Sequence, residues 1–301
     1  MISRRKSLLW QRLARSTLLT LTISFGIGLI LLLALHFSTI MPLNQLAHKT
    51  SDVNAIKMQQ QVKALQSELL SSWEEEAKAR NLIVSLPVQF QAKTFKDVLL
   101  TDREKVIALT FDDGPWPKST DQILNILKQH QIKGTFFWIG ENVQNYPQIA
   151  QKVANDNQAI GNHTWHHWYR RMNAATAKSE IERTATAIYE TTGVKTALFR
   201  PPGGILNNGP ADYAKTQKYG VVMWSSDSED YSRPPVAQLV KNVLRHVKPG
   251  GIVLMHDGGG DRSHTVEALP QIINALANKG YRFVTVPELL EIKDKESGAA
   301  M

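Results

Sequence analysis

Two adjacent aspartates end a short apolar run of the sequence. The run at 106–109 leads into the letters TFDDGPWP, in which Asp112 and Asp113 stand next to each other before a glycine and a proline. Successive side chains of an extended segment point to opposite sides, so we expect different work from the two carboxylates. One would bind a metal ion and the other would take a proton from water, with nearby cations offsetting the repulsion between them. The alternative is a turn whose acids cap the next helix.

Side chains suited to acid–base chemistry or metal binding follow four later apolar runs. They are His163, His166 and His167, then Arg200, then Asp227 and Asp230, and finally His256 and Asp257. Two neutral imidazoles and one carboxylate form a ligand set that leaves coordination positions open for water, as a catalytic metal requires. At helical spacing His163 and His167 would lie on one face about 5 to 6 Å apart, and His166 would also be within reach of His163. The pattern predicts a metal-dependent hydrolytic site and leaves the choice between His166 and His167 open.

The elements that must position these residues alternate along the chain. Strands are expected at 106–109, 135–139, 159–161, 197–199, 221–224, 252–255 and 281–284, and helices at 120–130, 147–155, 178–191, 210–219, 235–246 and 265–279. Strands that alternate with helices imply crossover units and a parallel sheet. The pattern predicts an α/β fold, a closed or nearly closed barrel. The carboxyl ends of parallel barrel strands share one rim, so residues far apart in sequence would converge there.

Five segments of the chain resemble, in order and spacing, the motifs of the NodB-like polysaccharide deacetylases, carbohydrate esterase family four. They are TFDDG, HTWHH, RPPGG, DSEDY and IVLMH, at residues 110–114, 163–167, 200–204, 227–231 and 252–256. The resemblance covers residues 104–290. It implies a distorted (β/α)7 TIM-like barrel and the metal-dependent removal of acetyl groups from N-acetylglucosamine polymers.

The resemblance also implies a role for each residue of these motifs. Asp113, His163 and His167 would bind Zn²⁺ or another divalent metal such as Co²⁺, and Asp112 would be the base. Arg200 would orient Asp112, and His256, paired with Asp230, would be the general acid that protonates the leaving amine. Leu254 would line the acetate pocket.

Two positions depart from the family pattern. The third motif usually carries an aromatic residue where this chain has Gly203, and the fourth usually ends in tryptophan where this chain has Tyr231. Both positions line the substrate groove in the family, so the departures bear on which polymer is bound. Replacement surfaces for stacking sugars would come from tryptophans, although core packing is an equal alternative for each of them: Trp116, Trp165, Trp168 and Trp224.

The positive charge of the chain is concentrated at its start. Five of the eight net positive charges come from Arg4, Arg5, Lys6, Arg12 and Arg15, and the rest is too little to predict nucleic-acid binding. An uncharged apolar run at 17–37 follows, long enough to cross a membrane, and we expect an uncleaved anchor rather than a signal peptide. Basic residues before the run keep that end in the cytoplasm, so the rest would lie outside.

The expected organisation has five parts. They are a cytoplasmic basic arm at 1–16, the transmembrane anchor at 17–37, a helical stalk and connecting segment at 42–103, the deacetylase domain at 104–290 and a tail at 291–301. Within the stalk, apolar residues at loose helical spacing predict a helix over 52–80 that serves as a spacer or packs on the domain.

The predicted function is deacetylation of an N-acetylated extracytoplasmic polysaccharide such as peptidoglycan or an exopolysaccharide. No obligate protein partner is indicated, and the membrane is expected to be contacted through the amino-terminal helix. One alternative is an esterase for O-acetylated, xylan-type glycans, because the same attack by water serves an ester. Another is a catalytically silent glycan-binding protein, whose sequence mark would be the loss of a metal ligand or of the base.

Overall fold

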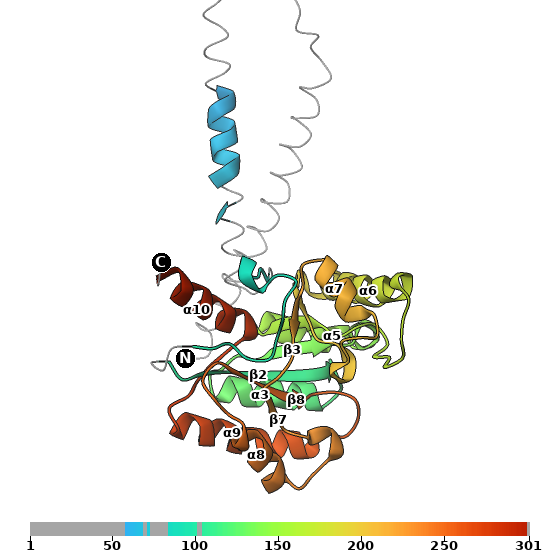
Figure 1. Cartoon of the computed structure of the whole chain (residues 1–301), viewed down its shortest axis with the longest axis vertical. Helices are drawn as coiled ribbons and strands as arrows, with labels where there is room; N and C mark the ends of the chain where they lie inside the picture. The colour runs from blue at the N-terminus through green and yellow to red at the C-terminus, as the bar shows by residue number, and fades with distance from the viewer. Residues whose placement is uncertain (1–57, 69–70, 73–83, 101–103, 300–301) are drawn as a thin grey trace, which may run out of the picture. The chain divides into compact units, whose positions relative to one another are not determined.

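The computed structural model describes residues 58–68, 71–72, 84–100 and 104–299 (Figure 1). The chain forms two compact units, Met1–Ser67 and Glu68–Met301. Residues 58–68 and 71–72 are helical, inside the helix predicted over 52–80. The predicted basic arm and membrane anchor lie outside the described residues. Among the described residues, no helix is both long and apolar enough to span a membrane.

A parallel sheet forms the centre of the second unit. Its long strand β2 (Val106–Gly114) pairs with β3 (Thr135–Trp138) and with β8 (Gly251–His256), and β9 (Arg282–Val284) also pairs with β2. The strand order is β1-β6-β5-β4-β3-β2-β8-β7. The remaining strands are β1 (Thr94–Phe95), β4 (Ala159–Asn162), β5 (Leu198–Phe199), β6 (Gly220–Val222) and β7 (Ser226–Asp227).

Helices follow most of the strands and cover the sheet (Figure 1). Figure 1 shows α8 and α9 side by side, and residues of the two helices are in contact. The helix α6 begins after Asn173, whose side chain accepts a hydrogen bond from the backbone N–H of Thr176, and ends at Gly193 in the left-handed conformation. The helices are α3 (Ser119–Gln129), α4 (Gly140–Asn145), α5 (Pro147–Asn155), α6 (Ala174–Thr192), α7 (Pro210–Thr216), α8 (Val236–Arg245), α9 (Ser263–Asn278) and α10 (Val286–Ala299). Short 3-10 turns are η1 (Val88–Phe90), η2 (Pro202–Gly204) and η3 (Asp230–Ser232).

The core explains why β2 occupies the middle of the sheet. Every residue of β2 is buried, and its Phe111 stacks on Phe136 of β3 with ring centroids 5.0 Å apart. Burying an apolar side chain of this size contributes about 1.5 to 3 kcal/mol relative to leaving it in water. A strand that is buried on both faces therefore carries an almost continuous apolar sequence.

The parallel α/β sheet predicted from the sequence is confirmed, but the sheet has nine strands where seven were predicted, because β1 and β7 were not expected. Three further differences are found. First, β2 runs on to Gly114, so both aspartates belong to the strand itself. Second, the sheet is not a fully closed ring of strands among the described residues. Its strand order ends at β1 and β7, and one isolated bridge from Asp97 to Gly251 joins the segment after β1 to β8. Third, α10 crosses the predicted domain end at residue 290 and buries Leu289 and Leu290 in the core.

Candidate active site

The doubled aspartate sits on an irregularity of β2. Asp112 pairs with Phe137 and Gly114 pairs with Trp138, so Asp113 is an extra residue between two regular pairs, and its φ is +71°. A bulge of this kind turns a side chain away from the regular alternation of a strand. The expectation that the two carboxylates point to opposite sides is therefore wrong. Both line one cavity, although their partners differ.

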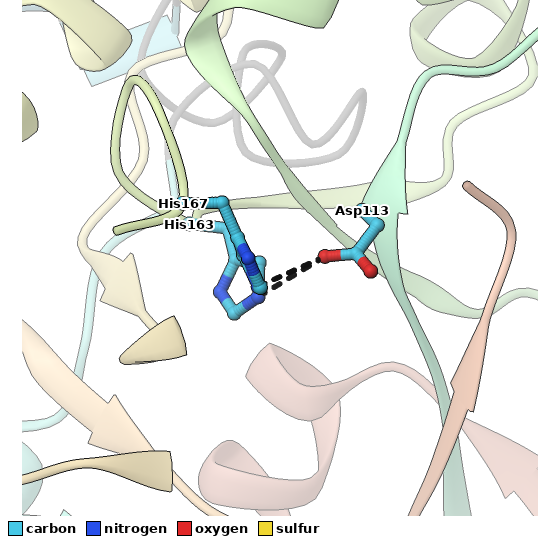
Figure 2. Close-up of side chains that lie close together, drawn as sticks. All are labelled: Asp113, His163 and His167. Atoms are coloured by element: carbon cyan, nitrogen blue, oxygen red, sulfur yellow. Dashed lines mark ion pairs between the residues drawn. The ribbon is translucent and has the colours of Figure 1, made fainter. Parts of the chain in front are cut away.

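Asp113 faces two imidazoles. Its Oδ1 lies 3.5 Å from Nε2 of His163 and 3.2 Å from Nε2 of His167 (Figure 2). The three candidate ligand atoms all lie within 4.8 Å of one another. Oδ1 of Asp113 is buried and accepts no hydrogen bond from the described part of the chain. A buried oxygen without a donor, facing two nitrogens, fits a divalent cation with nitrogen and oxygen ligands such as Zn²⁺.

A loop, and not a helix, brings the two histidines together. Residues 163–167 follow β4 without helical structure, and Thr164 and His167 have φ of +66° and +59°. The hydroxyl of Thr164 accepts a hydrogen bond of 3.1 Å from the backbone N–H of His167, which closes the turn. The ring centroids of His163 and His167 end 4.9 Å apart. The helical spacing argument was therefore wrong about the local structure, although the pair still meets.

The structure also decides the choice left open between two histidines. His166 turns away from the triad: its Nδ1 lies 2.6 Å from Oε1 of the buried Glu180, and its ring stacks on Trp168 at 4.1 Å. The other carboxylate oxygen of Glu180 accepts hydrogen bonds from the backbone N–H groups of Trp165 (3.0 Å) and His166 (2.9 Å). Glu180 on α6 thereby holds the loop that presents His167. Nothing in the local sequence pattern marked this glutamate.

His163 is oriented from behind by a backbone carbonyl. Its Nδ1 lies 2.6 Å from the carbonyl oxygen of Arg200, and Nε2 is left facing Asp113. A hydrogen bond from the outer ring nitrogen commonly sets the tautomer of a metal-binding histidine. Burial, together with the neighbouring His167, holds the pKa of His163 well below its ordinary value. The imidazole is therefore neutral and can offer its lone pair.

Asp112 is paired with a fully buried arginine. Nη1 of Arg200 donates to Oδ1 of Asp112 at 2.7 Å and to the hydroxyl of Thr110 at 2.8 Å, and Nε donates to the carbonyl of Val222 at 3.0 Å. Burial raises the pKa of Asp112 to about 6, although the charge of Arg200 opposes that rise. The pKa of a carboxylate so placed lies close enough to neutrality to both take up and release a proton.

His256 forms a second charged pair in the same cavity. Its Nδ1 lies 2.6 Å from Oδ1 of Asp230, and its backbone N–H donates to Oδ2 at 2.8 Å. The hydroxyl of Thr265 donates to the same Oδ2 at 2.7 Å. Burial alone would lower the pKa of His256, but the hydrogen bond and charge of Asp230 outweigh it and raise that pKa to about 9. His256 is therefore protonated at neutral pH.

The residues predicted to bind substrate line the same cavity of about 550 Å³: Gly203, Trp224, Tyr231 and Leu254. Trp224 donates from Nε1 to Asp227 at 3.1 Å. Trp165 is buried, and Asp257 is fully buried with its Oδ2 bound to the hydroxyl of Thr120, so neither faces this cavity. Arg262, which the polar loop at 258–265 offered as a substrate contact, also lines it, and so does Tyr169, which was not assigned a place in it from the sequence.

Known proteins are similar to this chain in sequence and in fold. The sequence model of the family described as polysaccharide deacetylase matches residues 100–222. Over 195 residues the chain is 44% identical to a peptidoglycan-N-acetylglucosamine deacetylase of Bacillus cereus, and the match covers 64% of this chain and 91% of that protein. The solved structure of the Bc1960 peptidoglycan N-acetylglucosamine deacetylase is 35% identical, with a TM-score of 0.62 over 67% of this chain and 94% of that chain. The Xyl-CE4 domain of a multidomain xylanase from the hindgut metagenome of Trinervitermes trinervoides is 40% identical, with a TM-score of 0.58 over 64% of this chain and 92% of that domain.

Proposed function

This chain belongs to the polysaccharide deacetylases of carbohydrate esterase family 4, and from that premise we propose that it is a metal-dependent N-acetylglucosamine deacetylase acting on an extracytoplasmic polysaccharide. It is a hydrolase of carbon–nitrogen bonds other than peptide bonds. Peptidoglycan is the polymer we favour, because two of the similar proteins are named peptidoglycan N-acetylglucosamine deacetylases.

One observation carries the proposal. The triad of Asp113, His163 and His167 lies in the same cavity as Asp112 and His256, two groups whose pKa values are displaced in a way that suits a base and an acid. Titratable groups with opposite proton-transfer tasks in one cavity are typical of catalytic sites. A glycan-binding protein without catalysis would not need this separation of roles.

Each residue has a task in the proposed reaction. A divalent cation held by the triad would polarise the acetyl carbonyl and lower the pKa of water. Asp112, held by Arg200, accepts a proton from the attacking water. His256 keeps its proton through Asp230 and delivers it to the amide nitrogen as the carbon–nitrogen bond breaks, which leaves acetate and a free amine. Leu254 offers an apolar wall to the acetyl methyl group.

The extracytoplasmic location is part of the proposal. It is supported by the five cations that precede the uncharged run at 17–37, since basic residues stay on the cytoplasmic side of a membrane anchor. Fusion of a reporter enzyme to the carboxyl end, in cells with an intact inner membrane, tests it. Activity of a reporter that functions only in the cytoplasm would contradict the proposed orientation.

Acetate release tests the activity. The purified full-length protein, loaded with Zn²⁺ or Co²⁺, should release acetate and expose free amines on N-acetylglucosamine oligomers and on peptidoglycan. Asp113→Ala is the matched inactive variant, and it should also lose stoichiometric metal. Release no greater than that of Asp113→Ala across these metals and glycans would contradict the proposal. Faster release from O-acetylated xylan would instead support the esterase alternative.

A further inference from the structure

Tyr169 is an exposed aromatic residue at the rim of the catalytic cavity. It follows His167 by two positions, is 59% exposed, and lines the cavity. Its ring stands edge-on to His167, with centroids 5.1 Å apart and an interplanar angle of 74°. A single exposed tyrosine on an open surface needs no explanation. One that stands next to a candidate metal ligand, at the mouth of a cavity, is placed where substrate must pass.

The glycine at position 203 makes room for this ring. A Cβ added at Gly203 would lie only 2.8 Å from Cε1 of Tyr169, so the exposed ring would have to move aside. Gly203 also has φ of +59°, a conformation that other residues adopt at a cost. Tyr169 therefore lies directly against the backbone of η2, over the place from which a larger residue at 203 would project into the cavity.

The backbone of Tyr169 is held by hydrogen bonds to the segment that follows Gly203. The buried Asn208 donates from Nδ2 to the carbonyl of Tyr169 at 3.4 Å, and the carbonyl of Asn208 accepts from the backbone N–H of Met172 at 2.8 Å. These two bonds fasten the loop that follows His167 to the segment that follows Gly203. A loop whose backbone is held before substrate arrives loses less conformational entropy when substrate binds.

A second exposed tyrosine lines the same cavity. Tyr231 is 54% exposed and edge-on to His256, with centroids 5.8 Å apart and an interplanar angle of 84°. The cavity therefore has one exposed tyrosine beside the metal triad and one beside the proposed acid. A flat apolar face with a hydroxyl at its edge suits the C–H faces and hydroxyls of a pyranose. Two such faces in one cavity favour a chain of sugars over a single sugar.

We propose that Tyr169 is a specificity-determining residue whose ring binds a sugar next to the one being deacetylated, on the His167 side of the cavity, in the space that Gly203 leaves open. The inference rests on the proposed function and narrows its substrate to chains of at least two sugars. It assigns the selection of chain length to a contact with the ring, and not to the metal site.

Chain-length selectivity tests the inference. We compare the metal-loaded full-length protein with Tyr169→Ala and Tyr169→Phe on N-acetylglucosamine and its dimer and tetramer. Tyr169→Ala should lower kcat/KM on the tetramer about tenfold, mainly through KM, which corresponds to about 1.4 kcal/mol. The loss should shrink as the substrate shortens. Tyr169→Phe keeps the ring and should stay within about twofold of the parent on the tetramer.

A matched control and a metal assay separate binding from support of the fold. Tyr189 on α6 is 49% exposed and lies outside the cavity lining, so Tyr189→Ala should leave tetramer kinetics unchanged. Bound metal should be stoichiometric in Tyr169→Ala. An equal loss at every chain length, or a loss of metal that accounts for the lower activity, would overturn the inference. An unchanged KM for the tetramer would overturn it as well.

A double-mutant cycle checks the part played by Gly203. Gly203→Ala should raise the KM for the tetramer in the parent, because the new Cβ displaces the ring of Tyr169. In the Tyr169→Ala background the same change should raise that KM much less, since no ring remains to be displaced. If Gly203→Ala raises the KM by the same factor in both backgrounds, the two residues do not act together on the substrate, and the role given to Gly203 is overturned.

Binding without turnover distinguishes this inference from the proposed function. Tetramer affinity is measured calorimetrically in an Asp112→Asn background, with and without Tyr169→Ala. If the parent releases no acetate but affinity depends on Tyr169, the deacetylase proposal fails, and of the inference only the contact between Tyr169 and a sugar stands. If acetate is released but the affinity for the tetramer is unchanged by Tyr169→Ala, the inference fails and the proposed function stands. Absence of both acetate release and binding would overturn both.

Discussion

Replacing Asp230 by asparagine should move the alkaline limb of the activity profile. His256 acts as an acid only while protonated, and its pKa of about 9 keeps the proton in place up to that pH. Burial lowers this pKa, and Asp230 supplies the hydrogen bond and the charge that reverse the effect. In Asp230→Asn the pKa should therefore return to the ordinary 6.5 or below. A fall from about 9 to 6.5 corresponds to about 3 to 4 kcal/mol, because each pKa unit is worth about 1.4 kcal/mol.

The assay is kcat/KM for acetate release between pH 5 and pH 10, which reports the ionisations of the free enzyme. For the parent, activity should fall as pH rises through the pKa of His256; for Asp230→Asn the fall should come more than one pH unit earlier. At pH 7.5 an imidazole with a pKa of 6.5 is only about one-tenth protonated, so protonation alone lowers the rate roughly tenfold. The charges of Asp112 and Asp113 add to the raised pKa and a bound cation opposes it. Both proteins are therefore compared at equal metal occupancy.

Two controls guard the interpretation. Asp212→Asn changes an exposed acid on α7 and should leave the profile unchanged. Thermal unfolding of the apo proteins should show that the proton of His256 stabilises the parent and that this stabilisation is lost at high pH. His256 has a raised folded pKa, so its proton stabilises the parent fully below pH 6.5, and this stability is lost as pH rises through about 9. An alkaline limb that stays in place in a folded, metal-loaded Asp230→Asn would refute the assignment of His256 as the acid.

Three further changes test groups that support the site. Glu180→Ala should weaken metal binding about 10- to 100-fold, because it removes the hydrogen bonds that hold the loop carrying His167. The control Glu190→Ala, at an exposed position of α6, should not weaken it. Equilibrium dialysis with Zn²⁺ measures both variants, and equal affinities would contradict the role of the buried glutamate. Thr110→Val should cost about 1 to 3 kcal/mol in urea unfolding, because it removes a buried acceptor from Arg200; no change would show that Arg200 needs no such partner. Burial raises the pKa of Asp257 to about 7, so the folded apo protein holds a proton that the unfolded chain has released, and its stability falls as pH rises from 3.8 to 7. Asp257→Asn should flatten this pH dependence of the urea unfolding midpoint. An unchanged pH dependence would contradict the raised pKa of Asp257.

Seven of the nine strands and the identity of the reactive residues could be predicted, because both are local properties of the sequence. Apolar runs and helical periods report on segments of a few residues, and a parallel barrel brings strand ends to one rim whatever the details. The departures at Gly203 and Tyr231 were also visible in the sequence. The amino-terminal anchor remains a prediction, since it lies outside the described residues.

The direction of each side chain was not a local property. The bulge at Asp113 decides that both aspartates face one cavity, and the left-handed turn at His167 decides that its imidazole meets that of His163. Both depend on backbone dihedrals that no periodicity reports. His166 and His167 are equivalent by spacing, and a glutamate 14 residues away from His166 separates their roles.

The sequence by itself determined which chemistry was available to this protein: a strand that ends in two acids, followed by histidines, an arginine and a further acid pair in the order of a known family. The tertiary structure alone decided how that chemistry is divided. Partners distant in the chain decide which nitrogen of His163 faces the cavity, that the pKa of His256 rises, and where the ring of Tyr169 lies. The reason is that hydrogen bonds, burial and steric room at a site depend on groups that meet only after folding.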